Sequence, residues 1–309
     1  MLNYKEDLRT LLFIFTITAL LIVQWQFGEI QPLLYICCLI LAISVSIMVH
    51  NHIHSPLWKS DFFNLITDYW LTFFYGFPIC GWIPTHVMNH HVLNNQDGDY
   101  SQTDLVGKKN NLFTLLISPM VTSRVQVPSH FVYLKKLWTK DRRRCCKQIS
   151  QFVVLGGMML VAFILDWKKT LLYIFIPQQV AISTVLFFNY VQHVHADRDD
   201  RWDHTRDFVG KTLNFLLFNN GFHGAHHERP KLHWSKLPDM HSKIAHEINP
   251  VLIERNMVWF FFRVYILGLF SKRFRTQDLR EKRMSISDNP SQLSLSKIRV
   301  LTLYSSMSS

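Results

Sequence analysis

The stretch LLYICCLILAISVSIMVHNHIH, residues 33–54, decides the fold of this chain, because an apolar run passes directly into a cluster of histidines. Residues 33–49 carry no charge, and a helix needs roughly 17–25 such residues to cross a bilayer. If the helix continues through the cluster, His50 and His54 share one face while His52 points away. The stretch therefore predicts a membrane-spanning helix that presents two imidazoles at its end.

Three further runs are as apolar and carry no charge inside them; they cover residues 11–23, 152–165 and 171–188. Hydrophobic residues make up 49% of the 309 residues, yet the mean hydropathy is only slightly positive. Very apolar and very polar stretches must therefore alternate. We expect an all-α integral membrane protein with about four transmembrane helices. Because no small-residue cleavage site follows the first run, we expect a retained span and no signal peptide.

Lysine and arginine are unevenly distributed among the loops. The loop between the first two runs has none, and the loop between the third and fourth has only Lys168 and Lys169. Nearly all the others lie in the remaining segments, including residues 140–147 and 272–275. The positive-inside rule then places both termini and the long central segment in the cytoplasm. The net charge of +11 fits a membrane surface better than a nucleic-acid partner.

Three other apolar stretches contain charges, glycines or prolines that lipid tolerates poorly; they cover residues 61–85, 111–134 and 251–270. We expect the first to be re-entrant or interfacial and the last to be an interfacial helix. The middle one is interrupted by Pro119 and Pro128. The chain end is serine-rich, so we expect a membrane domain over residues 1–280 and a disordered tail over 281–309.

The sixteen histidines are concentrated in four motifs: HNHIH from residue 50, HVMNHH from residue 86, NYVQH ending at residue 193, and HGAHH from residue 223. Their spacing selects nine candidate metal ligands: His50, His54, His86, His90, His91, His193, His223, His226 and His227. Helical spacing of three and four residues brings imidazoles onto one face. The second and fourth runs both cross toward the cytoplasm, so every motif can reach one cytoplasmic site.

Nine imidazoles exceed one coordination sphere but suit two metal ions with four or five ligands each. Imidazole binds zinc, copper, iron and nickel, so the residues alone do not select the element. Five cysteines without CxxC spacing predict neither a disulfide framework nor a zinc ribbon. The fold expected is thus a four-helix membrane bundle with a cytoplasmic helical cap that holds a two-metal site.

Other polar side chains near the motifs suggest supporting roles. Asn219 lies four residues before His223, on the same face if that segment is helical, and could hold a metal-bound water in a catalytic role. Four acidic residues flank the motifs and could accept the second ring proton of a ligand: Asp97, Asp99, Asp197 and Glu228. We assign structural roles to the remaining histidines: His52, His130, His195, His204, His233, His241 and His246.

At these motifs the chain resembles the membrane fatty acid desaturase superfamily, over roughly residues 30–250. HNHIH, HVMNHH and HGAHH resemble its three histidine boxes. NYVQH resembles an additional motif of bacterial members and alkane hydroxylases, and NNGFHGAHHERPKLHW is similar to third-box segments of bacterial desaturases. The second box reads HxxxHH, whereas many acyl desaturases have HxxHH.

This resemblance implies two iron ions, molecular oxygen as co-substrate and a fatty acyl chain or similar lipid as substrate. Desaturation is the reaction favoured, while hydroxylation of an alkyl chain and oxidative decarboxylation to a terminal alkene stay open. The chain has no flavin fingerprint, haem-carrying domain or CxxC pair, so its electrons must come from a separate protein of ferredoxin, rubredoxin or cytochrome type. No nucleic acid is expected as a partner.

A histidine-rich membrane protein could instead transport metal ions. Transporters place their ligands near the middle of the bilayer, in interrupted helices. Here the candidate ligands lie at the ends of the apolar runs or outside them. The placement favours an enzyme.

Overall fold

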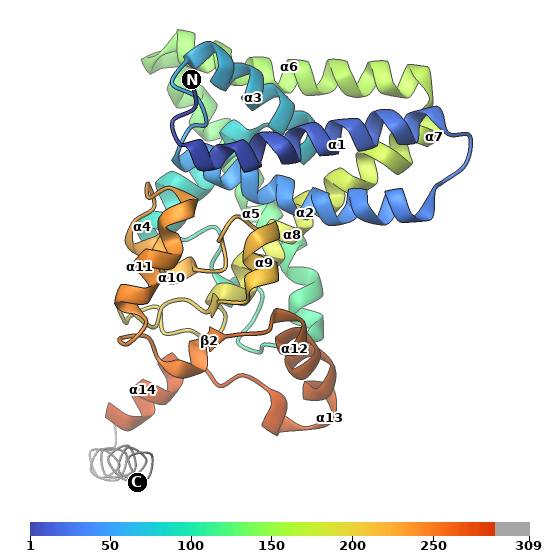
Figure 1. Ribbon diagram of the computed structural model, residues 1–309. Helices are drawn as coiled ribbons and strands as arrows, with labels where there is room; N and C mark the ends of the chain where they lie inside the picture. Colours follow the sequence, from blue (N-terminus) through green and yellow to red (C-terminus); the bar gives the residue numbers. More distant parts are fainter. Residues whose placement is uncertain (288–309) are drawn as a thin grey trace.

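The computed structural model describes residues 1–287, and within them four helical segments are long and apolar enough to cross a membrane. They cover Lys5–Gln26, Pro32–His54, Arg142–Leu165 and Trp167–His193. The four predicted spans are confirmed, and each reaches several residues beyond its apolar run. In Figure 1 they extend side by side to the right, while the rest of the chain forms a lobe around their other ends.

The fold of this part of the chain is mostly helical, with very few residues in strands. The larger helices are α1 (Leu8–Gln26), α2 (Pro32–His54), α3 (Asp61–Tyr75), α5 (Leu112–Lys140), α6 (Arg142–Leu165) and α8 (Ile176–His193). The shorter ones are α4 (His91–Leu93), α7 (Trp167–Thr170), α9 (Lys211–Leu216), α10 (His223–Glu228), α11 (Leu237–Ile244), α12 (Met257–Phe261), α13 (Gly268–Phe270) and α14 (Leu279–Ser287). Two strands, β1 (Asp207–Phe208) and β2 (Ile253–Glu254), form one short parallel pair.

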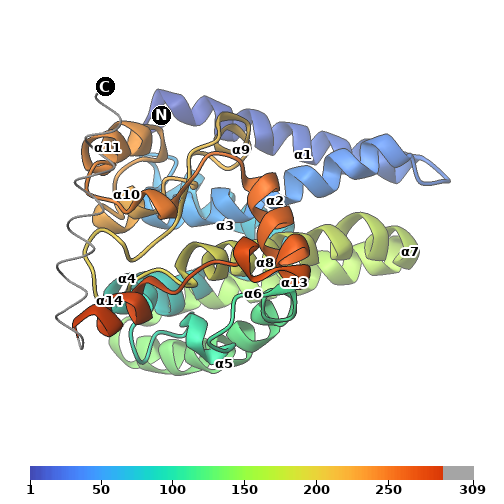
Figure 2. The same ribbon diagram turned by 90° about the horizontal axis from the view of Figure 1, so that it is seen from below.

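The largest apolar core joins the inner ends of the spans to the lobe. Val45 and Val49 of α2 and Val185 of α8 are buried in it, with Phe218 and Leu252 from the lobe. Seen from below, α1 and α2 lie on one side of α8, and α6 lies on the other (Figure 2). The outward faces of the spans stay apolar and exposed, as membrane helices require. The core thus packs the inner ends of α2 and α8 against the lobe.

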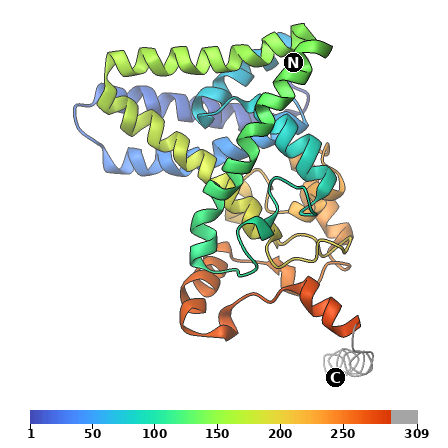
Figure 3. The same cartoon turned by 180° about the vertical axis from the view of Figure 1, so that it is seen from behind.

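Helix α5 differs from the sequence prediction, because Pro119 and Pro128 lie inside one continuous helix. Proline lacks the N–H that would bond to the carbonyl four residues earlier. At Pro119 the freed carbonyl belongs to Leu115, and the Ser118 hydroxyl donates to it at 2.8 Å. This local partner offsets part of the cost of the proline. Figure 3 shows α5 crossing from the lobe to the start of α6.

The two other ambiguous stretches form short helices. Residues 61–85 contain α3, which has 15 residues and is not among the four candidate spans. Most of residues 251–270 form a helical segment, Met257–Phe270, which is also shorter than a span. Residues 281–287, the first part of the predicted disordered tail, are helical and form most of α14. The rest of that predicted tail, residues 288–309, lies outside the described residues.

Candidate metal centre

All nine predicted ligands come together where α2 and α8 meet the lobe, and they form two groups. The first contains five imidazoles: His50, His54, His86, His91 and His226. The second contains four: His90, His193, His223 and His227. Within each group the candidate ligand atoms lie within 4.8 Å of one another. Each group could hold one metal ion.

The first group is centred on His91. Its Nε2 atom lies 3.1 Å from Nε2 of His54, 3.1 Å from Nε2 of His86 and 3.0 Å from Nε2 of His226. The α-helical geometry of α2 places His50 and His54 one turn apart, as predicted, and their rings are in edge contact. His52 points away and lies 3.0 Å from Asp68, so its structural role agrees with the sequence prediction.

The second histidine box divides between the groups because it is not an α-helix. Residues Ile83–His90 form a π-helix, whose hydrogen bonds join residues five apart. His86 and His91, five apart, therefore lie on one face and enter the first group. His90 points to the second group, so the box does not repeat the four-residue spacing of the first box as the sequence suggested. Short π-helical segments are frequent at functional sites.

The second group is the more deeply buried. Nε2 of His223 lies 3.1 Å from Nε2 of His193 and 3.2 Å from Nε2 of His227. His193 is the last residue of α8, while His223 and His227 are one turn apart on α10. His226, on another face of α10, belongs to the first group. Two of the three histidine boxes thus supply residues to both groups.

The ring nitrogens of the nine histidines are arranged for binding metal ions rather than for hydrogen bonding to one another. Two Nε2 atoms can share only one hydrogen, yet Nε2 of His91 faces three others. The Nε2 atoms of His50 and His90 are buried without a hydrogen-bond partner. Metal–imidazole distances of about 2.0–2.1 Å would separate adjacent ligand atoms by about 3 Å, which matches the short contacts between the rings.

Burial also keeps the lobe histidines in the form that binds metals. It is the foremost cause that lowers the pKa of His86, His223, His226 and His227 well below the ordinary value, and neighbouring imidazoles lower it further. Charging one ring would bury a cation beside other rings. These side chains are therefore neutral at physiological pH, as metal ligation requires.

Polar contacts at Nδ1 orient several of the rings so that Nε2, the other ring nitrogen, faces the neighbouring histidines. Nδ1 of His90 lies 2.8 Å from the buried carboxylate of Asp99, and Nδ1 of His193 lies 3.2 Å from the carbonyl of His204. Nδ1 of His50 lies 3.3 Å from the amide oxygen of Asn51. Such partners fix the ring orientation and raise ligand basicity.

Of the four acidic residues proposed for this role, Asp99 alone contacts a candidate ligand. The carboxylates of Asp97, Asp197 and Glu228 pair with arginines instead: Arg198, Arg283 and Arg201. All four residues are close to a histidine box in the sequence, so this closeness did not show which of them contacts a ligand. Asp99 differs because its chain segment folds back, and its carboxylate also accepts the backbone N–H groups of Asn95 and Ser101.

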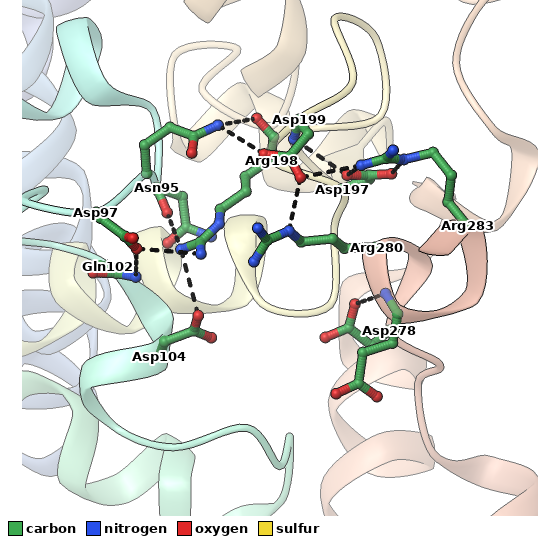
Figure 4. A network of polar contacts seen from close by, with 12 residues as sticks. Asn95, Asp97, Gln102, Asp104, Asp197, Arg198, Asp199, Asp278, Arg280 and Arg283 are labelled. Carbon is green, nitrogen blue, oxygen red and sulfur yellow. Dashed lines mark hydrogen bonds and ion pairs between the residues drawn. The ribbon is translucent and has the colours of Figure 1, made fainter. Parts of the chain in front are cut away.

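An ion-pair network braces the segments that follow His91 and His193 (Figure 4). Arg280 of α14 donates to Asp199 at 2.8 Å, and Arg283 bonds to both Asp197 and Asp199. Arg198 reaches the other way, to the carbonyl of Asn95 at 2.9 Å and to the carboxylates of Asp97 and Asp104. The network therefore holds α14 across the end of the site that carries the second group.

The helical argument for Asn219 is wrong. Helix α10 begins at His223, and Asn219 sits in the preceding turn with a positive φ of 60°. Its side-chain amide donates to the carbonyl of Trp234 at 3.1 Å. Its neighbour Asn220 is the one that lines the cavity described next.

The other histidines given structural roles belong to neither metal group.

A cavity opens beside both groups and touches His50, His86 and His223. Its apolar wall comes chiefly from Tyr75, Phe77, Trp82, Val127, Ile182, Val185, Leu186 and Phe188. Its uncharged polar wall includes Thr85, Ser101, Ser123, Gln126, Asn189, Gln192 and Asn220. Sequence reasoning did not find these residues, because α5 and α8 bring together segments about sixty positions apart.

The chain belongs to the fatty acid desaturase family, whose model matches residues 30–262. This match covers all nine candidate ligands and confirms the resemblance seen in the histidine boxes. The chain is therefore a membrane protein and an enzyme of a family of fatty acyl oxidoreductases. Searches of curated protein sequences and of solved structures found no match.

Proposed function

We propose that the nine histidines hold two iron ions, and that the protein uses molecular oxygen to desaturate a fatty acyl chain or a similar lipid. The cavity that touches both histidine groups carries this proposal. It brings a largely apolar, uncharged space directly to the ligands, as an alkyl substrate requires. The bound irons would activate molecular oxygen, the oxidant that breaks an unactivated C–H bond.

The chain's own residues position the substrate and the ligands. Trp82 lines the cavity and contacts His50 and His86 through its ring, with centroid distances of 5.7 and 5.1 Å, so it supports these two rings of the first group. Asp99 and the carbonyl of His204 orient rings of the second group. These buried contacts keep the donor atoms in place before a metal ion or a substrate binds.

We place the site and both termini on the cytoplasmic side. The distribution of lysine and arginine supports this orientation, because basic runs lie at the end of the bundle that carries the histidines. Helix α6 begins with one of these runs, at Arg142, and its apolar part leads away from the site. A separate electron-donor protein would then reach the site from the cytoplasm.

The test is a reconstitution with iron, an electron donor, oxygen and labelled lipids. Desaturation predicts a product two hydrogens lighter than its substrate, formed only when oxygen is present. A product heavier by one oxygen atom would replace desaturation by hydroxylation, and an alkene one carbon shorter would replace it by decarboxylation. If acyl, free-acid, alkane and carotenoid substrates all stay unchanged while vesicles take up metal, the protein is a transporter and the proposal fails.

A further inference from the structure

The cavity beside the histidines is not uniformly apolar. On α8, Ile182, Val185 and Leu186 line it first, and Asn189 follows one turn before His193. Ile182 and Asn189 are seven residues apart, or about 10 Å along the helix. The apolar part therefore lies toward the membrane interior, and an amide lies next to the metal groups.

Helix α5 adds polar groups to the same wall. Ser123 and Gln126 line the cavity, and Gln126 donates its amide to the Ser101 hydroxyl at 3.0 Å. Its amide oxygen has no protein partner in the described part of the chain. The side chains of Ser123 and Asn189 have none there either. Uncharged donors and acceptors thus face the space beside His50 and His223.

Asn189, Gln126 and Ser123 are half-buried, so their free amide and hydroxyl groups are open to the cavity and can bond to a molecule bound there. A cavity built only for methylene groups would not carry them. Among the described residues that line this cavity there is no Asp, Glu, Lys or Arg. The lining therefore suits an uncharged oxygen function, such as a hydroxyl, a carbonyl or an ester, more than a fixed ionic pair.

We infer that the substrate carries an uncharged oxygen function that binds to Asn189, Gln126 and Ser123, close to the carbon that is attacked. The inference rests on the proposed function and names its substrate class. Its consequence is positional: the oxidised carbon is counted from the oxygen-bearing end of the substrate. The apolar part of the cavity then accepts chains of different length.

The first test measures binding to metal-free protein, so that it does not depend on turnover. A photoreactive long-chain alcohol is competed with an unlabelled alcohol, a methyl ester and an alkane of equal length. The oxygenated competitors should bind more tightly than the alkane. Asn189→Leu should weaken the alcohol and the ester about five-fold, the loss of one hydrogen bond, without changing the alkane. Gln126→Met should weaken the alcohol alone, because the free amide oxygen of Gln126 accepts from a hydroxyl and an ester has no hydrogen to donate. Equal affinity for all three competitors, in every variant, would overturn the inference.

Control variants separate this role from general damage to the helices. Thr184→Val on α8 and Ser129→Ala on α5 change polar residues that do not line the cavity. Both should bind the alcohol like the unmodified protein. If either weakens alcohol binding as much as Asn189→Leu does, the selectivity does not reside in the cavity wall, and the inference is wrong.

The second test uses the iron-loaded enzyme and substrates of increasing chain length. The new double bond or hydroxyl should keep its distance from the oxygen-bearing end, and Asn189→Leu should spread the positions. If the new group instead keeps a constant distance from the methyl end, the inference is wrong, but the proposed desaturase function stands. Absence of any product, with selective binding preserved, would instead overturn only the proposed function.

Discussion

His86 and His91 lie on one face of a helix although they are five positions apart in the sequence, and their Nε2 atoms are 3.1 Å apart. The relationship depends on the π-helix over Ile83–His90, because an α-helix would place these two rings about 140° apart. The same segment turns His90 toward the second group. One short segment therefore supplies residues to both groups of candidate ligands.

The two faces of α2 should respond differently to substitution. His50→Ala or His54→Ala should abolish activity and lower the metal content, because each removes a donor from the first group. His52→Ala should keep the metals but lower the free energy of unfolding by about 1–3 kcal/mol, because Asp68 and the Leu57 N–H lose a buried partner. Metal analysis and thermal unfolding check this. Equal metal loss in all three variants would show that His52 is also a ligand.

Asp99 should act on the second group alone. Asp99→Asn keeps the size of the side chain but removes the charge that orients His90. The affinity for one of the two metal ions should fall about 10- to 100-fold, while the other is retained. Titration with a competing chelator measures both affinities. Asp97→Asn is the matched control, since that carboxylate pairs with Arg198, and it should leave both affinities unchanged.

Acid should destabilise the metal-free protein. The pKa values of His86, His226 and His227 are lowered in the folded state, while in the unfolded chain they are about 6.5. Below about pH 6.5 the unfolded state therefore binds more protons, and the free energy of unfolding falls as the pH falls. Unfolding curves over this range check the slope. A variant with all three changed to Gln should have a shallower slope, and a stability that rises toward acid pH would contradict the assignment.

Membrane topology follows from the proposed orientation. Reporter fusions after Gln102, beyond the second box, and after Asp200, beyond α8, should both report the cytoplasm. The residues between α2 and α5 must not cross the bilayer for this to hold. Opposite locations for the two fusions would be incompatible with one site built from all four motifs. A fusion after Gly28, between α1 and α2, is the control and should report the other side.

The spans and the nine candidate ligands could be predicted from the sequence because both leave local signals. An apolar run is readable without tertiary information, and so is the spacing of His50 and His54. The π-helix at the second box was not readable, because its residues have no distinctive pattern. Asn219 was misplaced because the chain turns before His223. The continuous course of α5 through Pro119, where the Ser118 hydroxyl bonds to the carbonyl of Leu115, was not readable either.

The cavity and the partner of His90 depend on long-range packing. Gln126 and Asn189 are far apart in the sequence and meet only because α5 packs on α8. Asp99 looked equivalent to Asp97, Asp197 and Glu228 until the loop geometry distinguished it. Such choices are made by tertiary contacts, which leave no periodic trace in one sequence.

Metal analysis of protein purified without chelators tests the central claim most directly. Nine donors in groups of five and four imidazoles predict about two metal ions per chain, and the proposed function requires that they are iron. His50→Ala should lower the metal content of the first group, and Asp99→Asn should weaken that of the second. Finding two irons per chain, with these separate losses, is the result expected. Zinc in place of iron, or a single metal ion that both variants lose together, would contradict the account.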